Sequence, residues 1–169
     1  MKSETLQQRA NEAWAEDPRV VPMKASPAAL AFIRASGWFG SFIHQAWRSY
    51  PWSERFFLKH YLKPGHCLGL VEKGRLRAMG ACLIDPAKGE GSVPFFDAED
   101  TESAGILLEV IERRFAKAGV PCATAIIPPG GSRAMHLLDA LGWNSWERQE
   151  DYLVYEFPLD RLEEYRRSN

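Results

Sequence analysis

The feature that most constrains the fold is an alternation of strand-like and helix-like segments between residues 66 and 157. Apolar runs at 67–71 and 76–84 are joined by Glu72-Lys73-Gly74, and a third run at 92–97 follows a Gly-containing turn. Such short loops between apolar runs are typical of β-hairpins, so we predict a three-strand antiparallel meander.

Two helix-like stripes follow the meander. Apolar residues recur with helical spacing over 101–118, and Gly119 is expected to stop that helix. The buried-type strand 122–127 comes next, and then a helix that we expect Ser132 to cap. Strands at 143–146 and 152–157 complete the pattern, in which strand–helix–strand connections imply crossovers onto one shared sheet.

The first part of the chain is more helical. We expect a polar helix over 3–16, an edge strand over 19–24, a helix opened by Ser26-Pro27 and helical structure over 42–62. With 169 residues the chain fits one domain over 1–169: a strand plus helical region at 19–65 and a sheet core at 66–157. The predicted class is α/β (α+β), with a mixed, mainly antiparallel central sheet flanked by helices.

Composition narrows the function classes. The formal net charge is -1, so no basic field favours nucleic acid or an anionic membrane, and the pairs Arg113-Arg114 and Arg166-Arg167 are interpreted as solvated. No run approaches the length of a membrane span. The cysteines Cys67, Cys82 and Cys122 lack metal-ligand spacing. We therefore expect reduced thiols, no metal and a cytoplasmic protein.

Three segments carry a family resemblance: LLEVIERRFAKAG at 107–119, CATAIIPP at 122–129 and SRAMHLLDALGW at 132–143. Together with the element order they resemble the GNAT superfamily of N-acyltransferases, well over 66–157 and by layout over 19–65. The resemblance implies acetyl-CoA or another acyl-CoA bound between diverging fourth and fifth strands. It also implies a small-molecule or protein amine as acceptor, and leaves room for a homodimer through 143–157.

The resemblance also suggests cofactor-binding residues. Phe95 and Phe96 would hold the pantetheine arm through their backbone, and Thr101, Ser103, Ala104, Gly105, Ser132 and Arg133 would face the phosphates. The family's phosphate loop reads Gln/Arg-x-x-Gly-x-Gly/Ala, whereas this chain has Glu99-Asp100-Thr101-Glu102-Ser103-Ala104. Each close carboxylate–phosphate contact would cost on the order of 4 kcal/mol before solvent screening. The segment is then either an ordinary capped helix start or a shifted loop that still accepts phosphate.

The catalytic positions of the family also differ here. Leu138 stands where the resemblance implies a proton-donating tyrosine, and Gly131 where it implies an asparagine. Pro94 removes a backbone donor and favours a bulge, which the family commonly has in this strand. Asp97, at the end of the same strand, is our candidate general base, with a solvated turn aspartate as the alternative.

Nine aromatic residues fall within the 24 residues from Trp38 to Tyr61. Trp38, Phe42 and Trp52 are candidate substrate-binding residues of an acceptor wall, while core bulk and a protein-facing patch remain open. Two functions follow: an acyl-CoA-dependent N-acyltransferase, or a non-catalytic ligand- or protein-binding module of the same fold. Transfer from an acidic carrier protein is a weaker third option.

Overall fold

The computed structural model describes residues 17–39, 53–85, 87–149 and 152–167. One seven-stranded sheet runs through it in the order β1-β2-β3-β4-β5-β7-β6. The strands are β1 (Val20–Pro22), β2 (Cys67–Glu72), β3 (Arg75–Asp85), β4 (Glu90–Ala98), β5 (Cys122–Ile127), β6 (Asn144–Gln149) and β7 (Tyr152–Glu156). Only the β4–β5 pair is parallel, so the mixed, mainly antiparallel sheet is confirmed.

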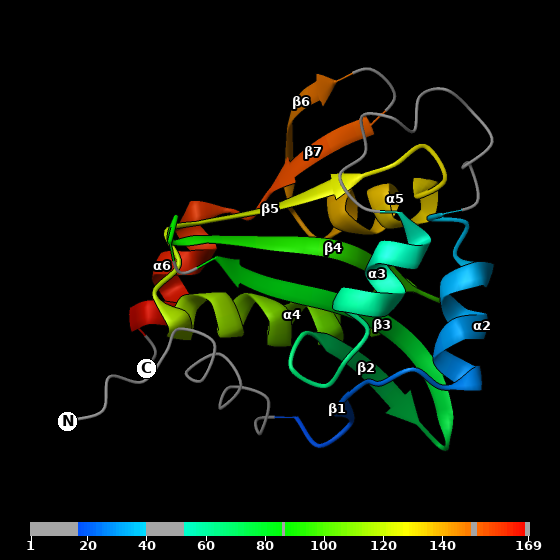
Figure 1. Cartoon of the computed structure of the whole chain (residues 1–169). Helices are drawn as coiled ribbons and strands as arrows, with labels where there is room; N and C mark the ends of the chain where they lie inside the picture. The colour runs from blue at the N-terminus through cyan, green and yellow to red at the C-terminus, as the bar shows by residue number, and fades with distance from the viewer. Residues whose placement is uncertain (1–16, 40–52, 86, 150–151, 168–169) are drawn as a thin grey trace.

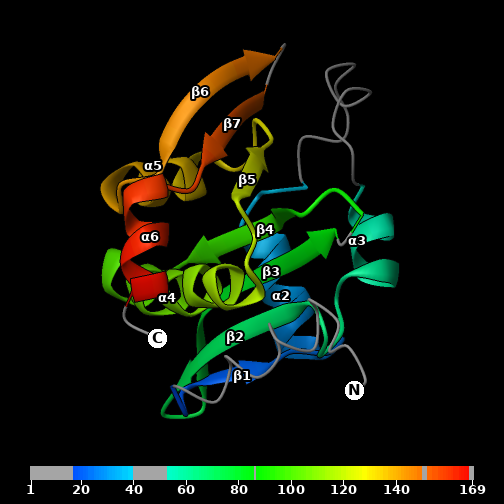
Figure 2. The ribbon, with the colours of Figure 1, turned by 90° about the vertical axis from the view of Figure 1, so that its left-hand side faces the viewer.

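Helices cover both faces of the sheet (Figures 1 and 2). The short helices α2 (Pro27–Ala35) and α3 (Glu54–His60) lie on one face. The helices α4 (Thr101–Ala118), α5 (Ser132–Ala140) and α6 (Leu159–Arg167) lie on the other. No described helix has the length and apolar character needed to cross a membrane.

Several local predictions are confirmed by the backbone. Ser26 caps α2 by accepting a hydrogen bond from the Ala29 N–H, with Pro27 at the first helical position. Gly119 ends α4 in the left-handed conformation, with φ of 74°. The edge strand β1 pairs with β2 through Val20–Pro22 and thereby extends the predicted meander by one strand.

Three local predictions need correction or addition. Ser132 does not cap α5: the cap position is Gly131, and Ser132 is the exposed first residue of the helix. Arg114 is fully buried rather than solvated, and its Nη2 donates to the Gly65 carbonyl at 2.7 Å. The C-terminal helix α6 was not predicted. The expected helix at 3–16 lies outside the described residues, as do residues 42–52 of the expected helical stretch.

The helix α6 is held to α4 by a buried carboxylate. Glu112, 2% exposed, accepts hydrogen bonds from Trp143 Nε1 at 3.1 Å, Arg161 Nη2 at 2.6 Å and Tyr165 Oη at 3.1 Å. Three donors on one carboxylate satisfy the polar requirement of a buried charge. This cluster joins α4 to α6, near the C-terminal end of the described residues.

Candidate active site: the gap between β4 and β5

The parallel strands β4 and β5 pair for only part of their length. Their register runs from Glu90 opposite Cys122 to Val93 opposite Ala125 and then stops, although β4 continues to Ala98 and β5 to Ile127. Figure 1 shows the two strands diverging towards their C-terminal ends. Beyond Val93 and Ala125, no ladder pairing joins the facing edges of the two strands.

A bulge in β4 coincides with the point of divergence. Ala81 of β3 pairs with Phe95, but Leu83 pairs with Ser92, so Val93 and Pro94 together face Cys82. An extra residue on one strand bends it and increases its local twist. Proline at this position also lacks the N–H that a continuing ladder would use. The bulge predicted at Pro94 is thus present, where the pairing between β4 and β5 ends.

The two phenylalanines after the bulge point to opposite faces of the sheet. Phe95 packs against α3, with its ring centroid 5.5 Å from that of Phe57. Phe96 lies on the α4 face, beside Gly80. A Cβ added to Gly80 would lie 3.2 Å from Phe96 and 3.0 Å from Ile111 of α4. Both rings are fully buried, so they pack on the two faces of the sheet and form no exposed surface.

Trp38 connects the two sides of the gap on the α2–α3 face. Its ring centroid is 5.2 Å from that of Phe95 on β4. On the other side, a Cβ added to Gly131 would lie 3.2 Å from Trp38 Cε3 and 2.7 Å from Ile127 Cγ2 of β5. The glycine is therefore required by packing: the indole of Trp38 and the side chain of Ile127 occupy the space that any larger residue at 131 would need.

An ion pair spans the C-terminal end of β4 and the start of α5. Arg133 Nε donates to Asp97 Oδ1 at 2.8 Å, and Arg133 Nη2 donates to Asp97 Oδ2. The Asp97 side chain is 2% exposed, whereas that of Arg133 is 45% exposed. The bidentate contact raises the pKa of Arg133 above its usual value, mainly through the hydrogen bond to Asp97.

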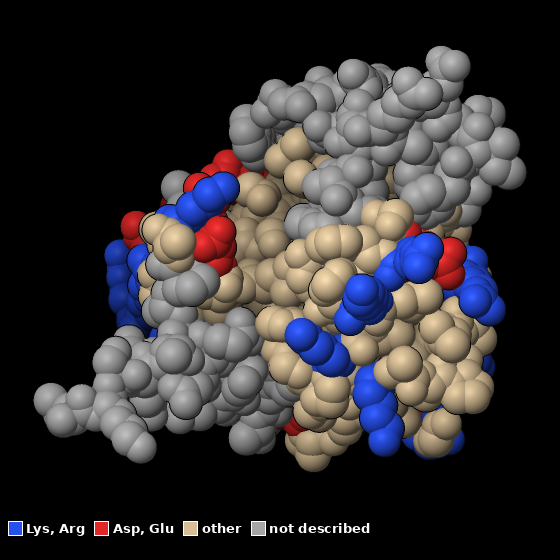
Figure 3. Space-filling view, in the orientation of Figure 1, with Lys and Arg blue, Asp and Glu red and all other residues tan. Residues whose placement is uncertain are grey.

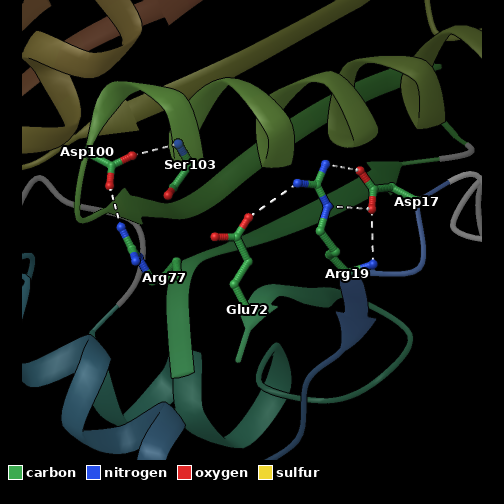
Figure 4. Close-up of polar contacts among 6 residues, drawn as sticks. All are labelled: Asp17, Arg19, Glu72, Arg77, Asp100 and Ser103. Atoms are coloured by element: carbon green, nitrogen blue, oxygen red, sulfur yellow. Dashed lines mark hydrogen bonds and ion pairs between the residues drawn. The ribbon is translucent and has the colours of Figure 1, made fainter. Parts of the chain in front are cut away.

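The start of α4 is a capped helix. Asp100 is the N-cap, and its Oδ1 accepts the Ser103 N–H at 2.7 Å while its Oδ2 pairs with Arg77 Nη2 at 2.7 Å (Figure 4). The hydrogen bond from the Ser103 N–H, followed by that from Arg77, lowers the pKa of Asp100 to about 2. Glu99 adds ion pairs to Arg75 and Arg77 at 2.7 and 2.9 Å. The segment therefore has the geometry of a capped helix start.

Most of the expected site residues lie around the same gap. Phe95, Phe96, Asp97 and Trp38 are buried along it, and Arg133 reaches it from α5. At the start of α4, which follows β4 directly, Thr101 is exposed, Ser103 and Ala104 are buried, and Gly105 is half-buried. Ser132 is exposed beside Arg133. Phe42 and Trp52 lie outside the described residues.

The prediction missed the arginines that face the acids of this region. Arg75 and Arg77 were not singled out, although their place at the start of β3, next to the end of β4, follows from the hairpin register. Among the described residues, no cluster of three His, Cys, Asp or Glu side chains is arranged to hold a metal ion. Leu138, at the position of the family's tyrosine, is fully buried, and His136 is exposed on the same helix.

No protein-family profile and no curated protein matches this sequence, but solved structures do. The putative acyl-CoA N-acyltransferase from Klebsiella pneumoniae superposes with a TM-score of 0.57 at 14% identity, covering 83% of this chain and 96% of that one. The GNAT domain of S. lividans PAT gives 0.55 at 18% identity, covering 82% and 88%.

A third similar structure is the putative acetyltransferase yncA from Salmonella typhimurium, solved with its cofactor acetyl-CoA. It superposes with a TM-score of 0.51 at 14% identity, covering 84% of this chain and 95% of that one. At such identities the similarity speaks for the fold alone. The diverging β4 and β5, the bulge and these superpositions together establish that the chain has the GNAT fold.

Proposed function

We propose that the protein is an acyl-CoA-dependent N-acyltransferase that acts on an amine of a small molecule or a protein. The observation that carries this proposal is the end of β4–β5 pairing at Val93 and Ala125, with β4 extending to Ala98. In this proposal an extended thioester arm lies along that stretch as an additional strand-like segment and hydrogen-bonds main-chain groups of the diverging strands.

The residues around the gap suit the pantetheine arm of an acyl-CoA better than they suit its phosphates. The backbone of Phe95 and Phe96 suits the pantetheine arm. For the phosphates, the start of α4 offers less than a helix N-terminus usually does, because Asp100 already accepts the Ser103 N–H. The cations Arg75, Arg77 and Arg133 lie close by and offset the acids. Thr101, Ala104, Gly105 and Ser132 would complete the phosphate contacts.

Asp97 is the proposed general base. Acyl transfer needs an unprotonated amine to attack the thioester carbonyl carbon, after which the carbon–sulfur bond breaks and the thiolate takes up a proton. Arg133 holds the Asp97 carboxylate in a bidentate contact, and a phosphate that drew Arg133 away would free that carboxylate. Since Leu138 cannot donate a proton, water supplies the one that the thiolate needs. Trp38 would line the acceptor side, with Phe42 and Trp52 as further candidates.

Calorimetric titration with acetyl-CoA and longer acyl-CoAs tests the proposal. We expect saturable binding that Arg133→Gln weakens, and turnover with an amine that Asp97→Asn lowers through kcat while KM for the acyl-CoA changes little. Arg113→Gln is a control, because Arg113 pairs with Glu109 on α4 and lies over the ring of Tyr165 on α6. Absence of binding at millimolar acyl-CoA would exclude the transferase.

A non-catalytic module of the same fold is the second candidate. Three observations favour it: Leu138 at the tyrosine position, the Asp100 cap at the start of α4, and the ion pair that joins Asp97 to Arg133. Turnover with any amine acceptor would refute it. We also propose that the protein is cytoplasmic, which the free thiols of Cys67 and Cys82 support. A homodimer could form through the sheet edge at β6.

A further inference from the structure

The helix α3 is fixed on the sheet by one buried side. Phe57 is fully buried, with ring centroids 5.5 Å from both Phe39 and Phe95. Ser53 caps the helix by accepting the Phe56 N–H at 3.1 Å. Because Phe57 sets the rotation of the helix about its axis, the residues on its opposite side are presented to solvent in a defined direction.

The exposed side of α3 and of the turn after it is basic and carries one aromatic ring. It consists of Arg55, Phe56, Lys59, His60 and Lys63, all exposed, which we call the α3 basic face. Phe56, 41% exposed, is the one large hydrophobic residue that is exposed in the described part of the chain. Its ring lies tilted against that of His60, with centroids 4.4 Å apart. Figure 3 shows the Lys and Arg side chains gathered over this face.

Among the described residues, the cations of this face differ from Arg19, Arg77 and Arg133, each of which pairs with an acid. Within residues 17–39, 53–85, 87–149 and 152–167, none of Arg55, Lys59 and Lys63 forms an ion pair. The acid at the start of the helix, Glu54, pairs with Arg34 at 3.5 Å instead. The net charge of the chain is -1, so a face of cations without ion pairs is a local excess of positive charge. These cations stabilise the fold through no ion pair among the described residues.

The α3 basic face is also close to the gap between β4 and β5. Phe57 on the buried side of α3 contacts Phe95, which lies in β4 just beyond the last residue paired with β5. Arg55, Phe56 and Lys59 are the neighbours of Phe57 on the outer side of the helix. A polypeptide lying over α3 would therefore place a terminal or side-chain amine within a few residues of the diverging strands.

We infer that the α3 basic face is the docking surface for an acidic polypeptide that carries the acceptor amine. This inference rests on the proposed transferase function and names its substrate class. Carboxylates of the polypeptide would pair with Arg55, Lys59 and Lys63, and an apolar side chain would cover Phe56. A bilayer would demand a broad apolar face rather than one ring, and nucleic acid a larger basic area.

Fluorescence anisotropy with two synthetic peptides tests the inference. The first has Glu-Glu-Leu repeats and a free N-terminal amine, and the second has Lys in place of each Glu. We expect the acidic peptide to bind, the basic one not to bind, and affinity to fall as salt rises from about 50 mM to about 500 mM. The double variant Arg55→Glu/Lys59→Glu should weaken binding about tenfold, and Phe56→Ala should weaken it as well.

Controls separate this inference from the transferase proposal. Lys88→Glu reverses an exposed charge in the turn between β3 and β4 and should leave peptide binding unchanged. All variants should bind acetyl-CoA like the wild type. If the wild-type protein does not bind acetyl-CoA, the transferase proposal fails. The peptide measurements still test the docking surface on their own. Equal binding of the two peptides would overturn the docking surface. Binding of anionic vesicles or duplex DNA without binding of the acidic peptide would overturn it as well.

Discussion

Asp97 and Arg133 form a bidentate ion pair whose two members differ sharply in exposure. The carboxylate of Asp97 is 2% exposed at the end of β4, while the guanidinium side chain of Arg133, on α5, is 45% exposed. The pair joins segments 36 residues apart in sequence and ties the end of one diverging strand to the helix that follows the other. A buried charge depends on its partner more than an exposed one does.

That asymmetry predicts unequal costs for the two single substitutions. Arg133→Met leaves a buried carboxylate without its partner and should lower the free energy of unfolding by about 3 kcal/mol. Asp97→Asn leaves an arginine that water can solvate and should cost about 1 kcal/mol. Urea denaturation at neutral pH measures both. The double variant should be more stable than Arg133→Met alone, and equal costs for the two single variants would contradict the argument.

Gly131 is predicted to be intolerant of even one methyl group. A Cβ at this position would lie 2.7 Å from Ile127 Cγ2 and 3.2 Å from Trp38 Cε3, so Gly131→Ala should destabilise the fold by about 1–3 kcal/mol. Gly65→Ala is the matched control, because no atom lies within 4 Å of its added Cβ. Thermal unfolding compares the two, and a midpoint for Gly131→Ala as high as that of the control would show that Trp38 and Ile127 yield easily.

The sequence was sufficient for elements with strong local signals. The meander, the bulge at Pro94, the helix at 101–118 and its stop at Gly119 all depend on residues that act on their own neighbourhood. Arg114 had a signal that was overlooked. It lies three residues after Ile111 and four before Ala118, on the helix side that those two residues bury.

Local sequence patterns do not predict polar contacts between segments that are far apart in the chain. The pairing of Asp97 with Arg133 depends on how far β4 and β5 diverge, which no local pattern specifies. The helix α6 was missed because only Leu162 among its described residues is a buried apolar residue, and much of its attachment comes from polar contacts to Glu112. Packing against α4, rather than an apolar stripe, stabilises that helix.

The cap of α4 predicts a stability difference that disappears in acid. Asp100 has a pKa of about 2, below its ordinary value of 3.8, because the folded state favours its ionised form. Its contribution is therefore complete above pH 3.8 and is lost as the pH falls towards about 2. Asp100→Ala should cost about 1 kcal/mol at neutral pH. Urea denaturation of both proteins over this range should show the two stabilities converging, and a constant difference would exclude the cap as the cause.

Glu112 should show the opposite dependence on pH. Burial raises its pKa above 4.5, despite the hydrogen bonds from Arg161, Trp143 and Tyr165. The folded state then binds the proton more tightly than the unfolded state does, so the wild type loses stability as the pH rises through the interval above 4.5. Glu112→Gln cannot ionise. The stability of this variant relative to the wild type should therefore increase as the pH rises through that interval.

Glu112→Ala separates the role of the hydrogen bonds from that of the charge. It leaves the indole N–H of Trp143 without its partner and removes the acceptor that holds α6, so it should cost more than Glu112→Gln at every pH. Hydrogen exchange of the α6 amides is the direct measurement, because that helix should lose protection before the sheet does. Unchanged protection of residues 159–167 in the alanine variant would show that α6 is held by its apolar contacts instead.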